Sequence, residues 1–338
     1  MRDQAAPRAA LAPLASVSAD AWRGLAGRAI EPNGYYLPDW EMAVNASARE
    51  RTDASAICAF GDNRLTGLLP VVPIWRAYRI PLPALVSADP YGTLCTPLLD
   101  REQAEAAALE LMRQAHNRAS APAGKGVRRP TGGGAPPSPL PNAAREGPAM
   151  KAFREELRRD GLRARLLQSY LRAALDATRN ADEVLQEALG AKKLKELRRL
   201  RNRLADHGAV HFGVARTPDE VASAVETFLA LEASGWKARR GTALALDQGD
   251  AAFVRRATVA LAGRGQCEVI TLSAGDTPVA AGIVLRHDDR AFFFKLGVDE
   301  RFAKYSPGVQ LTLELTRHLC ADPAIRFADS TAAPDHPM

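Results

Sequence analysis

Apolar residues in the first third of the chain form short runs that are separated by turn residues. Residues 55–60 (SAICAF) and 65–74 (LTGLLPVVPI) predict two strands. Gly61, Asp62 and Asn63 lie between them and include residue types that tolerate positive φ, so we expect the two strands to form a hairpin. Helical patterns flank this hairpin, at residues 36–48 and 101–116. These elements predict an α+β unit.

From residue 150 onwards, longer helical patterns precede a series of consecutive strands. Helical spacing is found at residues 150–160, in a basic stretch that ends at Gly208, and at residues 217–234, 250–262 and 306–319. Strand patterns are found within residues 163–175 and at residues 210–214, 267–273, 279–287, 291–298 and 325–328. This order predicts a second unit of the α/β class with a mixed sheet.

The length and composition agree with two globular domains, since the chain has 338 residues, of which 46% are hydrophobic and 25% are charged. We expect an irregular N-terminus over residues 1–30, an N-terminal half over 31–160 and a C-terminal domain over 161–338. Residues 119–148 contain six glycines and seven prolines, which predicts a disordered insertion or a locally altered reading frame.

The net charge of +6 is concentrated in one helix. Residues 192–203 contain seven Lys or Arg residues and one acid, Glu196. Such a stretch is suited to nucleic acid, an anionic membrane face or a phosphate-rich cofactor, but an ordinary solvated helix face has the same composition. Leucines at three- and four-residue spacing predict that the opposite side of this helix is buried.

Several classes of protein are excluded by what the sequence lacks. There is no continuous apolar stretch of membrane-spanning length and no secretory signal. The four cysteines are scattered, as expected in a reducing compartment, so we predict a cytoplasmic protein. Walker A, HExxH, GxSxG and dinucleotide-binding glycine motifs are absent, and the histidines have no metal-ligand spacing. We therefore expect no metal cofactor.

A candidate anion site follows the strand at residues 291–298. Ser306 and Pro307 fit the start of a helix, and Gly308 stands just inside it. The free N–H groups of a helix start attract anions, and Arg301 and Lys304 add positive charge. The simpler interpretation is a well-capped helix.

Four segments together resemble the GNAT acyltransferase superfamily, and more narrowly its CelD/BcsL-type acetyltransferases, which are related to the FemAB peptidyltransferases. They are NGYYLPDWEMA near the N-terminus, LRRLRNRLADHGAVHF (197–212), TFLALEASGWKARRGTAL (227–244) and TPVAAGIVLRHDDRAFFFKLGVDERFAKYSPGVQL (277–311). The resemblance covers residues 30–115 and 150–338. It implies a tandem GNAT-like acyl-CoA N-acyltransferase fold, with a C-terminal half that is truncated relative to its relatives and leaves strand edges exposed.

The resemblance also implies a donor site for acyl-CoA. In GNAT folds the pyrophosphate lies on the loop before the helix that follows the fourth strand, and the pantetheine arm pairs with that strand. Ala303 and Ser306 replace the usual Gln/Arg and first glycine of this loop. The implied donor-binding residues are Lys295, Leu296, Gly297, Val298, Arg301, Lys304, Tyr305, Ser306, Pro307 and Gly308.

Acyl transfer needs a base for the acceptor proton and a donor for the leaving thiolate. Glu232 is the first candidate for the base, although many helices carry an exposed Glu. Tyr305 is a candidate thiolate donor or a packed loop residue. Asp329 and His336 follow the last strand and are further catalytic candidates, or part of a polar tail. Trp236 and Lys237 are candidates for acceptor binding, with a core anchor and a surface lysine as the alternatives.

Three functions agree with these observations. The leading hypothesis is transfer of an acetyl or acyl group from acyl-CoA to an amine or hydroxyl of a small-molecule or polysaccharide-related acceptor, with nucleic acid as an unlikely partner. A FemAB-like transfer from aminoacyl-tRNA is the first alternative, because the basic helix could lie against RNA phosphates. A non-catalytic GNAT-fold interaction protein is the second.

Overall fold

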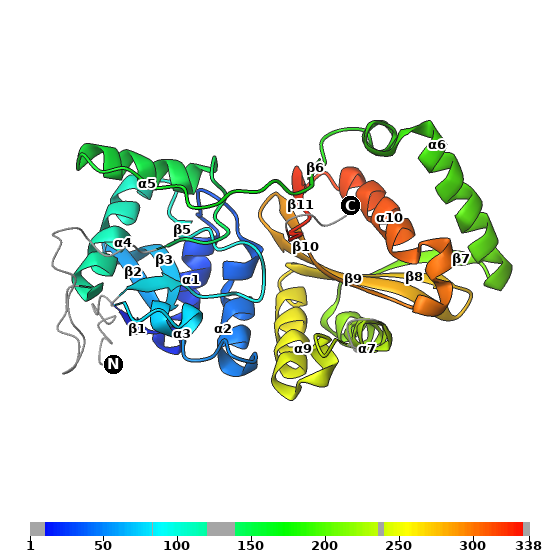
Figure 1. The fold of residues 1–338 in the computed structure, drawn as a ribbon, viewed down its shortest axis with the longest axis horizontal. Helices are drawn as coiled ribbons and strands as arrows, with labels where there is room; N and C mark the ends of the chain where they lie inside the picture. The colour runs from blue at the N-terminus through cyan, green and yellow to red at the C-terminus, as the bar shows by residue number, and fades with distance from the viewer. Residues whose placement is uncertain (1–10, 83, 120–138, 236–239, 334–338) are drawn as a thin grey trace. The chain divides into compact units, whose positions relative to one another are not determined.

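The computed structural model describes residues 11–82, 84–119, 139–235 and 240–333. They divide into two compact units (Figure 1). Unit 1 consists of Met1–Asn45 and Arg51–Ser169, and unit 2 consists of Ala46–Glu50 and Tyr170–Met338. Each unit has its own sheet with helices packed on it.

Unit 1 contains a sheet in which every printed strand pair is antiparallel. Its order is β1-β2-β3-β4, and β5 also pairs with β3. The strands are β1 (Ala12–Pro13), β2 (Ser55–Gly61), β3 (Arg64–Pro73), β4 (Leu85–Ser87) and β5 (Leu98–Leu99). The hairpin predicted over residues 55–74 is confirmed, and its positive φ angles occur at Asp62 (49°) and Asn63 (64°).

The helices of this part of the chain include one in the segment that the sequence suggested to be irregular. They are α1 (Ala19–Ala26), α2 (Pro38–Ser47), α3 (Ile74–Tyr78), α4 (Ala104–Ala119) and α5 (Pro148–Arg159). Ser18 caps α1, and Trp22 and Leu25 on this helix are fully buried. The indole N–H of Trp22 donates to the carbonyl of Tyr36 at 2.9 Å. Residues 19–26 therefore belong to the core of unit 1 rather than to an irregular start.

Only part of the predicted insertion at residues 119–148 lies within the described ranges. Residues 120–138 lie outside the described residues. The stretch that follows is attached to unit 1, because Cys95 N donates to Asn142 O at 3.1 Å and Ala149 N donates to Glu31 Oε2 at 3.1 Å.

Unit 2 contains a six-stranded sheet with the order β6-β11-β10-β9-β8-β7. The strands are β6 (Ala174–Asp176), β7 (Val210–Ala215), β8 (Cys267–Ala274), β9 (Thr277–His287), β10 (Arg290–Val298) and β11 (Phe327–Asp329). Neighbours are antiparallel except for β10 and β11, which are parallel. The mixed α/β fold with two sheets that the sequence predicts is thereby confirmed.

Helices cover both faces of this sheet (Figure 1). The helices are α6 (Ala181–Leu204), α7 (Pro218–Ser234), α9 (Gln248–Ala262) and α10 (Pro307–Ala321), with short turns η3 (Ala205–His207), η4 (Leu244–Leu246) and η5 (Glu300–Tyr305). In the figure α7 and α9 lie on one side of the sheet, and α10 and α6 lie on the other. Leucines 311, 315 and 319 of α10 pack on Ile270 and Leu272 of β8.

The strand expected within residues 163–175 begins at Ala174 and is only three residues long. It pairs with β11, with Phe327 opposite Asp176 and Asp329 opposite Ala174. As a result β11 lies between β10 and β6, so the exposed edge expected at this strand is covered within the chain. No helix in the described ranges has both the length and the apolar composition needed to cross a bilayer.

Candidate active site at the end of strand β10

The parallel strands β10 and β11 run together for only part of their length. The ladder joins Arg290–Phe292 to Phe327–Asp329, and β10 continues to Val298. Its register against β9 shifts between Phe293 and Lys295. The four residues predicted to bind the donor arm, Lys295 to Val298, therefore lie on β10 beyond the end of β11.

Helix α7 comes very close to this part of β10. A Cβ at Gly297 would lie 2.9 Å from the backbone nitrogen of Glu232 and 3.1 Å from the carbonyl oxygen of Phe228. Any larger residue at position 297 would push the helix away from the strand. Gly297 thus brings Glu232, the candidate base, to the strand that holds the candidate donor site.

Glu232 is buried, with 2% of its surface exposed, and its carboxylate is held from two sides. Oε2 accepts from the backbone N–H of Leu244 at 2.9 Å, and Oε1 lies 3.5 Å from Nζ of Lys295. The structure therefore joins two residues that the sequence singled out separately. The expectation of an ordinary exposed Glu is wrong, because α7 turns this side chain toward β10.

The turn after β10 is η5, and it is organised by Asp299. The Asp299 side chain accepts from the backbone N–H of Arg301 at 3.0 Å and forms an ion pair with its guanidinium at 2.7 Å. The hydrogen bond from the Arg301 side chain lowers the pKa of Asp299. Arg301 is nevertheless 80% exposed, so its charge faces solvent.

Helix α10 begins differently from the sequence prediction. Ser306 has a φ of 53°, and its side chain makes no capping hydrogen bond. A Cβ at Gly308 would lie 2.9 Å from Leu296 Cδ2 and 3.2 Å from Val298 Cγ1. Gly308 therefore permits close packing of α10 on β10, a role that the sequence did not indicate.

A hollow of about 290 Å³ lies beside η5. It is lined by His207, Thr277, Arg301, Phe302, Lys304 and Tyr305. Nε2 of His207 lies 2.9 Å from the phenolic oxygen of Tyr305, and Nζ of Lys304 lies 4.9 Å from the centre of the Tyr305 ring. Basic side chains thus gather around a hydrogen-bonding hydroxyl, which is an arrangement suited to an anion.

Three lining residues of this hollow were missed by the sequence analysis. Thr277 begins β9, Phe302 lies in η5, and His207 ends η3 directly before Gly208. His207 reaches Tyr305 because Leu204 and Leu197 on α6 are buried on the α10 side of the sheet. The leucine spacing of the basic helix indicated that one of its sides is buried. No local pattern indicated that the residue just after the helix, His207, would contact Tyr305.

The other predicted site residues are placed as follows. Asp329 ends β11, where its carboxylate pairs with Arg172 at 2.6 Å and accepts from the N–H of Thr331 at 2.8 Å. Asp329 is therefore already engaged within unit 2. Trp236, Lys237 and His336 lie outside the described residues.

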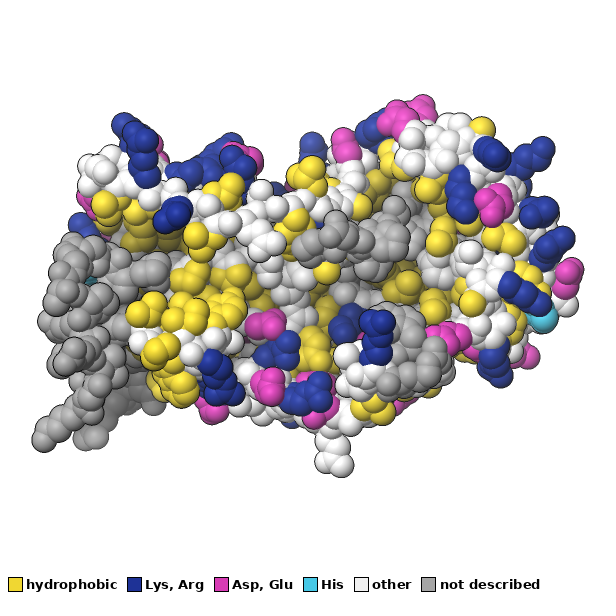
Figure 2. All heavy atoms as spheres, viewed as in Figure 1, with side chains coloured by type: hydrophobic (Ala, Val, Ile, Leu, Met, Phe, Trp, Pro, Cys, Tyr) yellow, Lys and Arg dark blue, Asp and Glu magenta, His cyan; other side chains and the backbone are white. Residues whose placement is uncertain are grey.

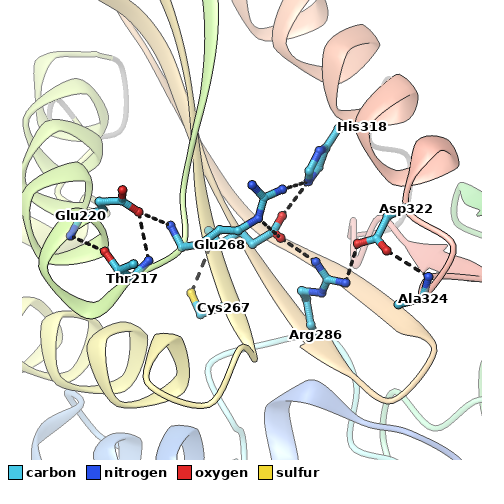
Figure 3. Close-up of polar contacts among 9 residues, drawn as sticks. Thr217, Glu220, Cys267, Glu268, Arg286, His318, Asp322 and Ala324 are labelled. Atoms are coloured by element: carbon cyan, nitrogen blue, oxygen red, sulfur yellow. Dashed lines mark hydrogen bonds and ion pairs between the residues drawn. The ribbon is translucent and has the colours of Figure 1, made fainter.

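A second polar cluster lies at the opposite end of the sheet, where β10 begins (Figure 3). The buried carboxylate of Glu268 on β8 binds His318 at 2.7 Å, Arg286 at 2.5 Å and Arg216 at 3.0 Å. Burial alone would raise the pKa of Glu268, but the hydrogen bond from His318 and the neighbouring positive charges lower it to about 2. Because these groups satisfy one another, the cluster fastens α10 to the sheet.

Comparisons with known proteins agree with this arrangement. Residues 191–335 match the acetyltransferase (GNAT) domain. Unit 2 therefore contains a GNAT domain of the acyltransferase type, and β10, η5 and α10 all lie within the matched residues. No curated protein is similar enough in sequence to match the chain.

Two solved structures resemble the whole fold. FemX is 10% identical, with a TM-score of 0.57 over 95% of this chain and 89% of FemX. The C-terminal domain of a putative lysylphosphatidylglycerol synthetase from Agrobacterium fabrum is 14% identical, with a TM-score of 0.53 over 94% of this chain and 78% of that chain. At these identities the likeness concerns the fold, and it extends across both units.

Proposed function

We propose that this protein is a CelD/BcsL-type acyltransferase, which moves an acetyl or other acyl group from acyl-CoA to an amine or hydroxyl of a small-molecule or polysaccharide-related acceptor. The observation that carries the proposal is the basic hollow beside η5, directly after β10 in a GNAT domain. An acyl-CoA has an anionic end and a long neutral arm. The basic hollow suits the anionic end, and the part of β10 beyond β11 suits the arm.

The anionic end of the donor would lie in the hollow. Lys304 and Arg301 line it, and charged donors of this kind make strong hydrogen bonds to phosphate oxygens, while the ring of His207 adds a further polar group to the wall. Tyr305 also lines the hollow, so we assign it to donor binding. It is not assigned to protonation of the thiolate, because the length of the pantetheine arm separates the thiolate from the phosphates. The arm would follow β10 from Val298 toward Lys295.

The reacting end of the donor would then come to rest near Glu232. The acceptor nitrogen or oxygen attacks the thioester carbonyl, the carbon–sulfur bond breaks, and the acceptor loses one proton while the CoA thiolate gains one. Glu232 is the group that we assign to receive the acceptor proton, because α7 holds it against β10 beside Lys295. Asp329 is the second candidate, and its carboxylate is held by Arg172 and the N–H of Thr331 on β11, beyond the segment of β10 that we assign to the donor arm.

Acetyl-CoA binding, measured by titration calorimetry, tests the donor and its site. Wild type should bind saturably, and Lys304→Glu should weaken binding at least about tenfold through charge reversal next to phosphate. Arg256→Glu on α9 is the matched control, because it changes the net charge equally at an exposed position that does not line the hollow. No binding by folded wild type, or equal loss in both variants, would refute the proposed donor site.

The basic helix favours aminoacyl-tRNA as a second candidate donor. Lys192, Lys195, Arg199 and Arg203 are exposed on α6 and recur at three- and four-residue spacing, so they share one face. Two other basic residues of the helix are paired, Lys193 with Glu196 and Arg201 with Glu314. This candidate predicts tRNA binding that falls steeply with salt and is lost on charge reversal at Lys192 and Arg199. If a folded chain binds neither acetyl-CoA nor tRNA, the non-catalytic interpretation is favoured.

A further inference from the structure

Unit 1 displays a run of apolar side chains on its surface at α3 and the loop that follows. We call residues 74–82 the α3 tip. Trp75 is 54% exposed, Tyr78 52%, Ile80 41% and Leu82 37%. Figure 2 shows hydrophobic side chains gathered over α3, with Lys or Arg side chains at the border. Large apolar side chains in contiguous exposure mark interaction sites more often than scattered ones do.

The backbone of the α3 tip is well organised, so this exposure is a property of the folded unit. Ile74 is buried and anchors the tip to the sheet. Its N–H donates to Ala84 O at 2.9 Å, and the N–H of Arg79 donates to Trp75 O at 2.9 Å. Arg79 has a φ of 58°, which ends the five-residue helix and turns the chain back toward β4. The side chains between these anchors are held outward.

The charge within the α3 tip is positive. Arg76 and Arg79 stand among the apolar residues, and residues 74–82 contain no acid. Arg76 lies 3.5 Å from the exposed carboxylate of Asp53. Arg79 is exposed and forms no ion pair within the described part of the chain. An apolar surface beside a guanidinium that has no acidic partner suits a binding partner with an apolar interior and an anionic surface.

We infer that the α3 tip docks on an anionic lipid bilayer. Trp and Tyr place an apolar ring and a polar edge at a membrane–water boundary, Ile80 and Leu82 supply short apolar insertions, and Arg79 reaches lipid phosphates. A protein partner fits less well, because the four side chains expose roughly 400 Å² at ordinary side-chain areas, whereas a stable interface buries about 800 Å² on each partner. Docking of this size is reversible and peripheral.

Vesicle sedimentation tests the inference with the full chain. The protein should bind vesicles of phosphatidylcholine mixed with phosphatidylglycerol and bind phosphatidylcholine vesicles far less. The triple variant Trp75→Ser, Ile80→Ser, Leu82→Ser should lose at least about tenfold in partitioning, since it removes the inserted apolar area. The control triple Phe60→Ser, Leu166→Ser, Leu167→Ser removes exposed apolar groups elsewhere in unit 1 and should bind like wild type.

Two further variants separate insertion from charge. Trp75→Phe should keep binding within about twofold, since a large ring remains, while it loses the quenching of tryptophan fluorescence by brominated lipids. Arg79→Glu should weaken binding to the anionic vesicles several-fold, about the effect of reversing a charge near the surface, whereas Arg113→Glu, an exposed position on α4, should not. Unchanged thermal unfolding of each variant shows that the losses are not caused by misfolding.

Three outcomes would overturn the inference. Folded wild type could fail to bind anionic vesicles, or both triple variants could lose binding equally. Alternatively, wild type could be a dimer that the α3-tip triple variant converts to a monomer, which would assign the tip to self-association. Acetyl-CoA binding in the same samples reports separately on unit 2, so failure of the donor proposal would leave this test intact.

Discussion

The phenolic oxygen of Tyr305 lies 2.9 Å from Nε2 of His207, and this contact joins the turn after β10 to the short helical turn after α6. The two rings also meet edge to face at a centroid distance of 5.4 Å. Through this pair, the end of the basic helix becomes one wall of the hollow that also contains Lys304. The candidate donor site is therefore built from segments that are far apart in the sequence.

His207→Ala should lower the affinity for acetyl-CoA about tenfold, and Tyr305→Phe about threefold, because each removes a hydrogen-bonding group from the wall of the hollow. Titration calorimetry measures both. His211→Ala, at an exposed position on β7, is the control and should bind like wild type. Unchanged affinity in His207→Ala would show that the anionic end of the donor lies elsewhere.

Lys295→Met should reduce the free energy of unfolding by about 3 kcal/mol, because it removes a charged partner from the buried carboxylate of Glu232. The double variant Glu232→Gln, Lys295→Met removes both charges and should regain most of that loss. Urea unfolding measures both free energies. A double variant that is less stable than Lys295→Met would contradict the assignment of this pair as a coupled ion pair.

Gly297→Ala should destabilise unit 2 by about 3 kcal/mol, at the upper end of the range for overpacking, because the new Cβ meets backbone atoms of α7 that cannot yield separately. Gly308→Ala should cost less, about 1 kcal/mol, since the ends of the Leu296 and Val298 side chains can adjust. At Gly263 a Cβ would make ordinary contacts, so Gly263→Ala should stay within about 0.5 kcal/mol. Equal effects at Gly297 and Gly308 would argue against the close approach of α7.

Glu268 should make the stability of the chain sensitive to acid. Its folded-state pKa is about 2, below the ordinary value of 4.5, so its contribution is fully present above pH 4.5 and is lost as the pH falls toward 2. The shift corresponds to about 3 kcal/mol at 1.36 kcal/mol per pKa unit. Denaturant unfolding across this window should show a slope that Glu268→Gln reduces and Glu102→Gln, at an exposed side chain, leaves in place.

The sequence predicted those parts of the structure that depend on local chemistry. Asp62 and Asn63 identified the hairpin because few residues accept positive φ, and Arg301 and Lys304 were recognised beside the start of α10. It did not predict the role of Gly308, because a glycine at a helix start looks the same whether it faces a ligand or a neighbouring strand. A glycine in the local sequence indicates that the backbone has more conformational freedom at that position, but it does not indicate which atoms pack against the glycine.

The remaining parts depend on contacts between distant residues. His207 meets Tyr305 because α6 and α10 pack on the same side of the sheet, which no short segment encodes. Glu232 is buried for a similar reason, since Gly297 lets α7 approach β10. The helix over residues 19–26 was missed because it has only two large apolar residues, Trp22 and Leu25, which fill the core of unit 1.

The pairing of β6 with β11 has a consequence for how unit 2 is made. Residues 174–176 leave the ribosome long before residues 327–329, so the outermost strand must wait for almost the entire unit to be synthesised. Contacts of such high sequence separation form late and slow folding. A fragment that begins at α6 would lack this strand, and two such fragments could pair through β11 in its place. Expression of unit 2 by itself should therefore begin before residue 174.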